Sequence, residues 1–201
     1  MKSIIAILAA AALIVAPGGA RAGGAVHARA FGDDIDLDRA PDGAYVTSFG
    51  GNIHVRNAAH MVRAASFGGD VRLDALDGSA HVSSFGGDVS VALIGPTNAR
   101  GRTVTVRSFG GDVSVTIPAG YAAAIDVVVE CTDDAVGCGI ESDVPLVQST
   151  GKWHRGLILF GERRRTTRGV ATVGDGANRL SIHAFGGTVR LVRERLAGRV
   201  R

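Results

Sequence analysis

The sequence predicts an all-β protein, a β-solenoid built from two-strand repeats of about 18 residues, and three observations support this. A short word centred on Phe-Gly-Gly recurs along the chain, and a fixed period of this size is typical of repeat architectures. Residues on both sides of the word alternate between apolar and polar, which is the period of a half-buried strand. No helical period occurs in the repeats. A rolled antiparallel sandwich is the less favoured alternative.

The word is clearest in SSFGGDVSV (83–91), and RAFGDDIDL (29–37) is a degenerate first copy. Three successive spacings between its phenylalanines are 18 residues, and the next is 24, with the extra residues near PTNARGR (96–102). HAFGGTVRL (183–191) is a late closing copy. The predicted repeat corners are Phe31, Phe49, Phe67, Phe85, Phe109 and Phe185, with Gly50, Gly51, Gly68, Gly69, Gly86, Gly87, Gly110, Gly111, Gly186 and Gly187.

The inward positions change phase at each word. Before the phenylalanine the odd offsets are small or apolar, as in Val82 and Ser84, whereas after it the even offsets are apolar, as in Val89 and Val91. The chain therefore turns a corner at Phe-Gly-Gly-Asp, for which glycine supplies the backbone freedom. We expect the following Asp or Asn to bond neighbouring backbone donors in an Asx-type turn. Stacked repeats would then form one continuous core.

The phenylalanine of the word has two interpretations. The favoured one buries each ring beneath its own corner, because aromatic side chains are mostly buried where a core exists. The alternative follows the alternation, which gives the phenylalanine the parity of the polar positions. In that case a column of rings faces solvent and marks a binding surface.

Residues 1–22 have the pattern of a secretory signal peptide: Lys2, an apolar run at 4–16 and Ala20-Arg21-Ala22 before the cut. The apolar run has 13 residues, fewer than the ~20 that span a bilayer. We therefore expect an exported protein that does not span the membrane, located in the periplasm, at the cell surface or outside the cell. Within one domain at 23–192 we expect regular repeats at 26–117, irregular coils and a cysteine loop at 118–167, and a closing repeat at 168–192, followed by a basic tail at 193–201.

Charge and cysteine content narrow the function classes. Removal of the signal peptide takes two of the 22 basic residues and none of the 19 acidic ones, so the net charge falls to +1. This balance gives no basis for nucleic-acid binding. The two cysteines, Cys131 and Cys138, are close together in a chain that we expect to be exported, so we predict a disulfide between them.

No motif for catalysis or for a cofactor stands out. The sequence has neither a nucleophile elbow nor a phosphate loop. Acidic pairs such as Asp36 with Asp38, or Asp74 with Asp77, are better explained as solvent-facing residues than as the paired carboxylates of a glycosidase. One acidic column, Asp70, Asp88 and Asp112, is a weak candidate for calcium, because each turn offers one carboxylate whereas calcium takes 6–8 oxygens. We expect no enzyme activity, no cofactor and no metal.

Three segments resemble one protein family. They are the recurring G-G-D-[VI]-x-[VL] word, IPAGY at 117–121, and GDGANRLSI at 174–182 with the GGTVRL that follows. On these residues the chain resembles the DUF4097 adhesin-like β-strand repeat proteins of bacterial envelopes over most of 25–192. The resemblance implies an exported repetitive β protein, associated in some members with surface adhesion or envelope stress, and it implies no catalytic residues.

The function expected from the sequence is a non-enzymatic, structural or adhesin-like binding module of the cell envelope. The candidate surface residues are Tyr45, Arg63 and His81 on one strand face and Arg72 on the other. Candidate partners are an envelope polysaccharide, another envelope protein, or a second copy added end to end through an unpaired strand edge. The alternatives are an envelope-stress accessory protein that binds a regulatory protein or a cationic peptide, and a polysaccharide-active β-helix enzyme.

Overall fold

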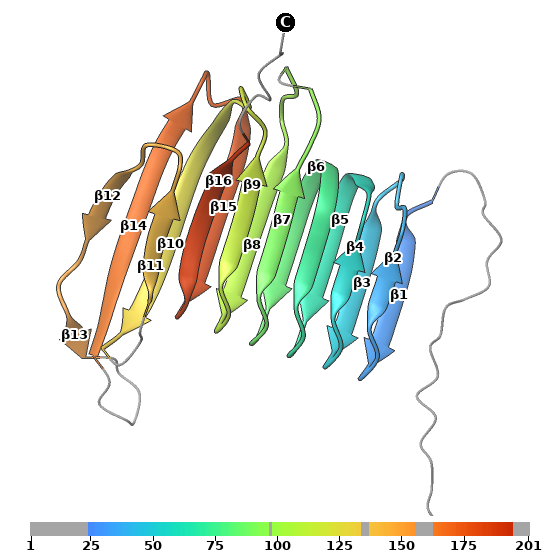
Figure 1. Ribbon diagram of the computed structural model, residues 1–201, viewed down its shortest axis with the longest axis horizontal. Coiled ribbons are helices and arrows are strands. Elements are labelled where there is room, and N and C mark those ends of the chain that lie inside the picture. Colours follow the sequence, from blue (N-terminus) through green and yellow to red (C-terminus); the bar gives the residue numbers. More distant parts are fainter. Residues whose placement is uncertain (1–23, 97, 134–136, 156–162, 195–201) are drawn as a thin grey trace, which may run out of the picture.

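The computed structural model describes residues 24–96, 98–133, 137–155 and 163–194 (Figure 1). The predicted signal peptide and most of the predicted basic tail lie outside these residues. The described chain consists of sixteen β-strands that belong to one sheet, which confirms the all-β prediction. It contains no helix, and so none that is long and apolar enough to cross a membrane.

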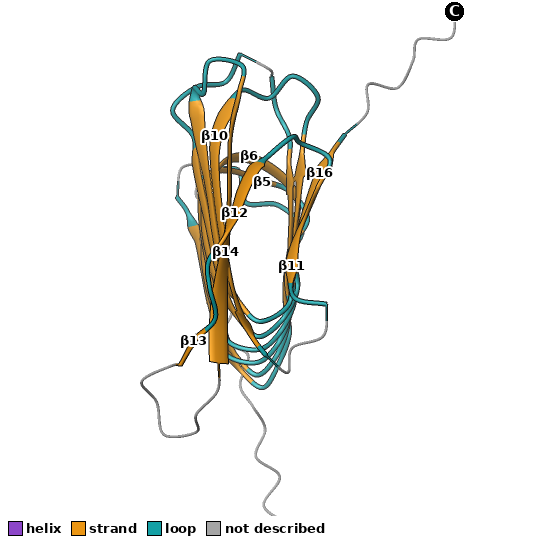
Figure 2. Ribbon diagram, turned by 90° about the vertical axis from the view of Figure 1, so that its left-hand side faces the viewer, coloured by secondary structure: helices purple, strands orange, loops and turns teal. Residues whose placement is uncertain are grey.

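The sheet folds over so that its strands form two walls facing each other (Figure 2). The first wall contains β1 (Val26–Phe31), β3 (Ala44–Phe49), β5 (Ala58–Ser66), β8 (Thr103–Phe109), β15 (Asn178–Phe185), β10 (Ala123–Thr132) and β14 (Arg163–Val173). The second wall contains β2 (Ile35–Leu37), β4 (Ile53–Val55), β7 (Val89–Leu93), β9 (Val113–Ile117), β16 (Thr188–Arg193) and β11 (Gly139–Ser142). Strand β6 (Val71–Ser84) joins them, because it pairs with β4 and β7 near its start and with β5 and β8 near its end.

Strands of successive repeats pair in parallel and in register. Val26 lies opposite Ala44, and Ala44 lies opposite Val62, so each step along the first wall advances 18 residues. The step from β6 to β8 is longer, because Ala80 lies opposite Val104. Equivalent residues of the repeats therefore form columns that run across the strands.

The core lies between the two walls and consists of the inward columns. It is built mainly from valine, leucine, isoleucine and alanine, and Val62, Val71, Val104 and Val113 are fully buried. One buried column is polar. Ser48, Ser66, Ser84 and Ser108 precede the four complete corners and are each at most 1% exposed.

A hydrogen bond of the buried hydroxyl explains why serine directly precedes the phenylalanine in the complete corners. The Ser66 hydroxyl donates to the Gly69 carbonyl and accepts from the Gly69 N–H, at 2.6 and 3.0 Å. Ser84 and Ser108 make the same donation to the second glycine of their own corners. Since a buried hydroxyl without a partner is costly, this bond is what permits serine in the core.

The second glycine of each corner is required by the neighbouring repeat. A Cβ on Gly87 would lie against the carbonyl group of Gly69, inside van der Waals contact, and 2.7 Å from the Asp70 nitrogen. Gly51, Gly69 and Gly111 meet the preceding corner in the same way. The degenerate first copy has Asp33 at this position, where its side chain is exposed. No described strand lies outside the first repeat, so the first corner lacks the neighbour that excludes a side chain.

The closing corner differs from the others. Gly186 and Gly187 both have positive φ, at 72° and 71°, as type I′ turns require. In the complete corners only the first glycine has a positive φ, for example Gly86 at 137°. Ala184 occupies the buried position that serine holds in the complete corners.

The closing repeat is inserted between strands that precede it in the chain. Strand β15 pairs in parallel with both β8 and β10, and β16 pairs with both β9 and β11. Strands β10 and β11 therefore do not pair with β8 and β9, the strands that precede them in the chain. Strands β15 and β16, from the end of the described chain, lie between these two pairs of strands. Between β11 and β14 the chain forms β12 (Val147–Thr150) and β13 (His154–Arg155), which pair antiparallel with β14, itself antiparallel to β10.

The predicted disulfide is confirmed. Cys131 in β10 is bonded to Cys138, which immediately precedes β11, with their Cα atoms 5.8 Å apart. The bond thus links the strand of the first wall to the strand of the second wall in the same irregular coil.

Candidate functional site

The phenylalanines of the repeats lie on the outside of the first wall, so the favoured interpretation of buried rings is wrong. Phe31 is 70% exposed, and Phe49, Phe67, Phe85 and Phe109 are between 43% and 52% exposed. Side chains alternate between the two faces of a strand, and each ring is an even number of residues from outward residues such as Tyr45 and Arg63, so it also points outward. The serine before each ring occupies the inward position instead.

The rings compensate for exposure by stacking on one another. Successive rings from Phe31 to Phe109 are nearly parallel, with centroids 4.8–5.2 Å apart. Each inner ring therefore has both faces covered by its neighbours, and its edge is what faces solvent. At the far end, the Arg164 guanidinium lies over the Phe185 ring at 4.7 Å.

A groove runs beside this column, across strands β1, β3, β5 and β6. Its floor consists of the small side chains two residues before the phenylalanines, Thr47, Ala65 and Ser83, which are half-buried. One side is formed by the residues four before the phenylalanines, which are His27, Tyr45, Arg63 and His81, and Phe31 is the phenylalanine that lines the groove. The groove encloses about 1030 Å³ and ends at Arg29 and Phe31 in the first repeat.

The outer face of the first wall carries uncompensated positive charge. Arg29, Arg63 and Arg107 all point outward from it, and none forms an ion pair with a described acidic residue. Arg63 lies over the Tyr45 ring, 5.6 Å from its centroid, and Tyr45 stacks on His27. None of the described residues that line the groove is acidic.

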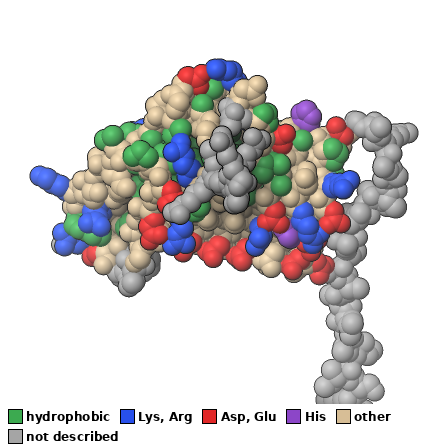
Figure 3. Space-filling model, turned by 45° about the horizontal axis from the view of Figure 1, so that its top comes forward, with side chains coloured by type: hydrophobic (Ala, Val, Ile, Leu, Met, Phe, Trp, Pro, Cys, Tyr) green, Lys and Arg blue, Asp and Glu red, His purple; other side chains and the backbone are tan. Residues whose placement is uncertain are grey.

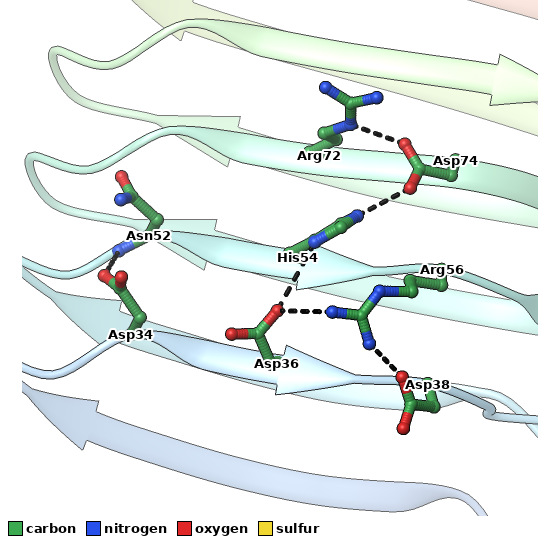
Figure 4. Close-up of polar contacts among 8 residues, drawn as sticks. All are labelled: Asp34, Asp36, Asp38, Asn52, His54, Arg56, Arg72 and Asp74. Atoms are coloured by element: carbon green, nitrogen blue, oxygen red, sulfur yellow. Dashed lines mark hydrogen bonds and ion pairs between the residues drawn. The ribbon is translucent and has the colours of Figure 1, made fainter.

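The outer face of the second wall is different, because several of its charged residues form ion pairs within a strand and between neighbouring strands (Figure 4). His54 contacts two carboxylates, Asp36 at 3.3 Å and Asp74 at 2.6 Å. Arg56 contacts Asp36 and Asp38, and Arg72 contacts Asp74 at 2.5 Å. Asp36, Asp38 and Asp74 are therefore components of one surface ion network, whereas Asp77 pairs separately with Arg102.

The pKa of Asp74 lies below its ordinary value. Partial burial acts to raise this pKa, but hydrogen bonds from His54 and Arg72, with the charges of both groups, together outweigh it. A carboxyl group whose pKa is lower in the folded state stabilises the fold above its unfolded pKa, and this contribution is lost as the pH falls through the folded value.

We accordingly expect the free energy of unfolding to fall more in the wild type than in Asp74→Asn between about pH 6 and pH 3. The difference should not exceed about 1 kcal/mol, as for exposed ion pairs. Urea titrations of both proteins at the two pH values measure it. Equal losses in the two proteins would show that the Asp74 contacts do not contribute.

The acidic column bonds across repeats, and not within its own turn as the Asx-turn interpretation expected. The Asp70 carboxylate accepts from the Asp88 N–H, and the Asp88 carboxylate accepts from the Asp112 N–H, both at 2.8 Å. The same bond joins Asp34 to Asn52, Asn52 to Asp70, and Asp112 to Thr188. In the described residues no group of three or more His, Cys, Asp or Glu side chains is placed to hold a metal ion. Acidic side chains gather along one edge of the molecule (Figure 3).

The structure separates the surface residues selected from the sequence. Tyr45, Arg63 and His81 lie together along the groove, whereas Arg72 lies on the opposite wall, in the ion network. Sequence reasoning missed the small floor residues and Arg29. The repeat itself could have indicated them, because all four lie two residues before a phenylalanine and therefore share its outward face.

Comparison of this chain with family models, with curated proteins and with solved structures finds no match. The function must therefore be inferred from the two outer faces themselves.

Proposed function

We propose that this protein is a non-enzymatic binding module of the bacterial cell envelope, exported and folded as a β-solenoid. The parallel in-register pairing of equivalent residues supports the solenoid, since each repeat adds one coil to the stack. A stack of this kind gives a rigid surface with a regular spacing. The resemblance to adhesin-like repeat proteins supports the envelope location.

The observation that carries the proposal is the difference between the two outer faces. The first wall exposes a column of five phenylalanines beside Arg29, Arg63 and Arg107, none of which pairs with a described acidic residue, whereas His54, Arg56 and Arg72 on the second wall are each paired with an aspartate. An exposed apolar surface of this kind is typical of interaction sites. Recognition through the first wall needs no pocket chemistry and no catalytic group.

Co-sedimentation with envelope fractions tests this function. The chain that begins at residue 23 should bind one fraction saturably, and Phe67→Ser combined with Phe85→Ser should abolish binding without lowering the melting temperature much. Arg72→Ala, on the second wall, is the matched control and should bind as the wild type does. Absence of binding to every fraction, or equal loss in Arg72→Ala, would exclude the proposed role of the first wall.

A further inference from the structure

The groove on the first wall has a polarity that limits what it can hold. Phe31 lines the groove directly, and Phe49, Phe67 and Phe85 follow on the same outward face, two residues beyond the floor. The other side contains Arg63, His27 and His81, with Arg29 at one end. The apolar and the basic residues lie on either side of a floor formed by Thr47, Ala65 and Ser83. A ligand for this site therefore needs an apolar part and an anionic part.

The apolar part contacts ring edges and not ring faces. Stacking at 4.8–5.2 Å covers the faces of the inner rings, so a flat ligand cannot stack on them. Offset or face-to-face aromatic contact is thus excluded along most of the column. A flexible hydrocarbon chain makes its contacts by dispersion and burial of area, for which ring edges serve as well as faces.

Sugar recognition fits the groove poorly. Carboxylate and amide side chains are the groups that bind several hydroxyls at once, and the described lining of the groove contains no Asp, Glu, Asn or Gln. The inner rings, whose faces are covered, cannot supply the stacking contact that sugars also use. The groove also spans four repeats, or about 14 Å at ~4.8 Å per strand, which is a length that a single extended chain can fill.

An intact membrane surface is also disfavoured. The exposed residues Asp70, Asp88 and Asp112 follow the phenylalanines by three residues, just around the corner. Docking of the phenylalanine column into an anionic bilayer would bring these carboxylates towards the headgroups. A single molecule lying in the recessed groove avoids this repulsion.

We propose that the groove binds a single-chain anionic amphiphile, a hydrocarbon chain with a carboxylate head. The chain lies along the phenylalanine column, and the carboxylate pairs with Arg63 or Arg29, which have no other acidic partner among the described residues. This assignment rests on the proposed function, because it names the ligand of the same face.

Fluorescence titration with dansyl-undecanoate, kept below its micelle concentration, tests the proposal. The chain from residue 23 should bind it saturably, and Arg63→Ala should weaken binding by about tenfold, the effect of one charge-assisted hydrogen bond. Ala65→Trp should abolish binding by filling the floor of the groove. Arg72→Ala should bind as the wild type does, and a neutral fatty alcohol should compete at least about tenfold more weakly than the fatty acid.

The absence of saturable binding, unchanged binding in Ala65→Trp, or equal competition by the alcohol would overturn the proposal. Melting curves show whether Ala65→Trp is folded, and Arg63→Ala carries the test if it is not. Stronger binding to vesicles of phosphatidylglycerol than to the monomeric fatty acid would assign the face to a membrane and also contradict the proposal. If the fatty acid does not bind but envelope co-sedimentation persists and still depends on the phenylalanines, the ligand assignment fails and the proposed function stands.

Discussion

Gly87→Ala should destabilise the protein by about 3 kcal/mol, the upper part of the usual range for overpacking. The added methyl group would collide with the carbonyl group of Gly69 and lie 2.7 Å from the Asp70 nitrogen. Both are backbone atoms of the neighbouring corner, so no flexible side chain can move away. Relief requires the two repeats to separate, which breaks the ladder bond between Asp70 and the Asp88 N–H.

Thermal unfolding followed by circular dichroism measures this effect, and the melting temperature should fall by roughly 10 °C. Gly139→Ala is the matched control, because nothing lies within 4 Å of its added Cβ and its backbone has no positive φ. Its stability should change by no more than about 0.5 kcal/mol. Similar melting temperatures for Gly87→Ala and Gly139→Ala would show that the repeats are not packed as closely as their corners require.

Removal of the closing repeat should have a still larger effect. A chain that ends at residue 177 lacks β15 and β16, which pair on both sides with β8, β9, β10 and β11. Leu180, Ile182 and Leu191 are each 1% exposed, so their loss leaves a gap through the core. We expect the shortened chain to lose its cooperative unfolding transition and to self-associate through the edges that it exposes on β8, β9, β10 and β11.

Size-exclusion chromatography and denaturant titration would show this loss. A synthetic peptide of residues 178–194, added during refolding, should restore the monomer and the transition, whereas a scrambled peptide of the same composition should not. A shortened chain that remains monomeric and unfolds at the midpoint of the full chain would disprove the inserted position of the repeat. Ile182→Ala in the full chain should cost about 2–5 kcal/mol, as expected for a buried isoleucine.

Much of the fold can be predicted from the alternation and the 18-residue period. Both are local signals: Val82 and Ser84 face inward because strand side chains alternate, and Gly86 allows a backbone conformation that other residues avoid. The pairing of Cys131 with Cys138 also followed from sequence separation. The place of the closing repeat could not be predicted, because it is set by pairing with β10 and β11, which are distant from β15 and β16 in the sequence.

The candidate site was less predictable for a physical reason. The general preference of aromatic rings for the core favoured burial of Phe67, whereas its parity indicated exposure. The ring is partly covered without entering the core because Phe49 and Phe85 cover its faces. This contact exists only after the repeats are in register, so no short stretch of sequence contains it. The acidic column has the same origin, since its backbone donors lie 18 or more residues away.

Asp33 determines where this protein can lengthen. Its side chain occupies the position at which every later complete corner needs glycine to accept a neighbour. A new repeat cannot be added outside the first one unless this residue changes, whereas an extra 18-residue unit between Phe49 and Phe67 meets a complete glycine corner on either side. Duplication of an internal repeat is therefore the route by which the chain would grow. Each added unit would lengthen the phenylalanine column, and the groove beside it, by ~4.8 Å.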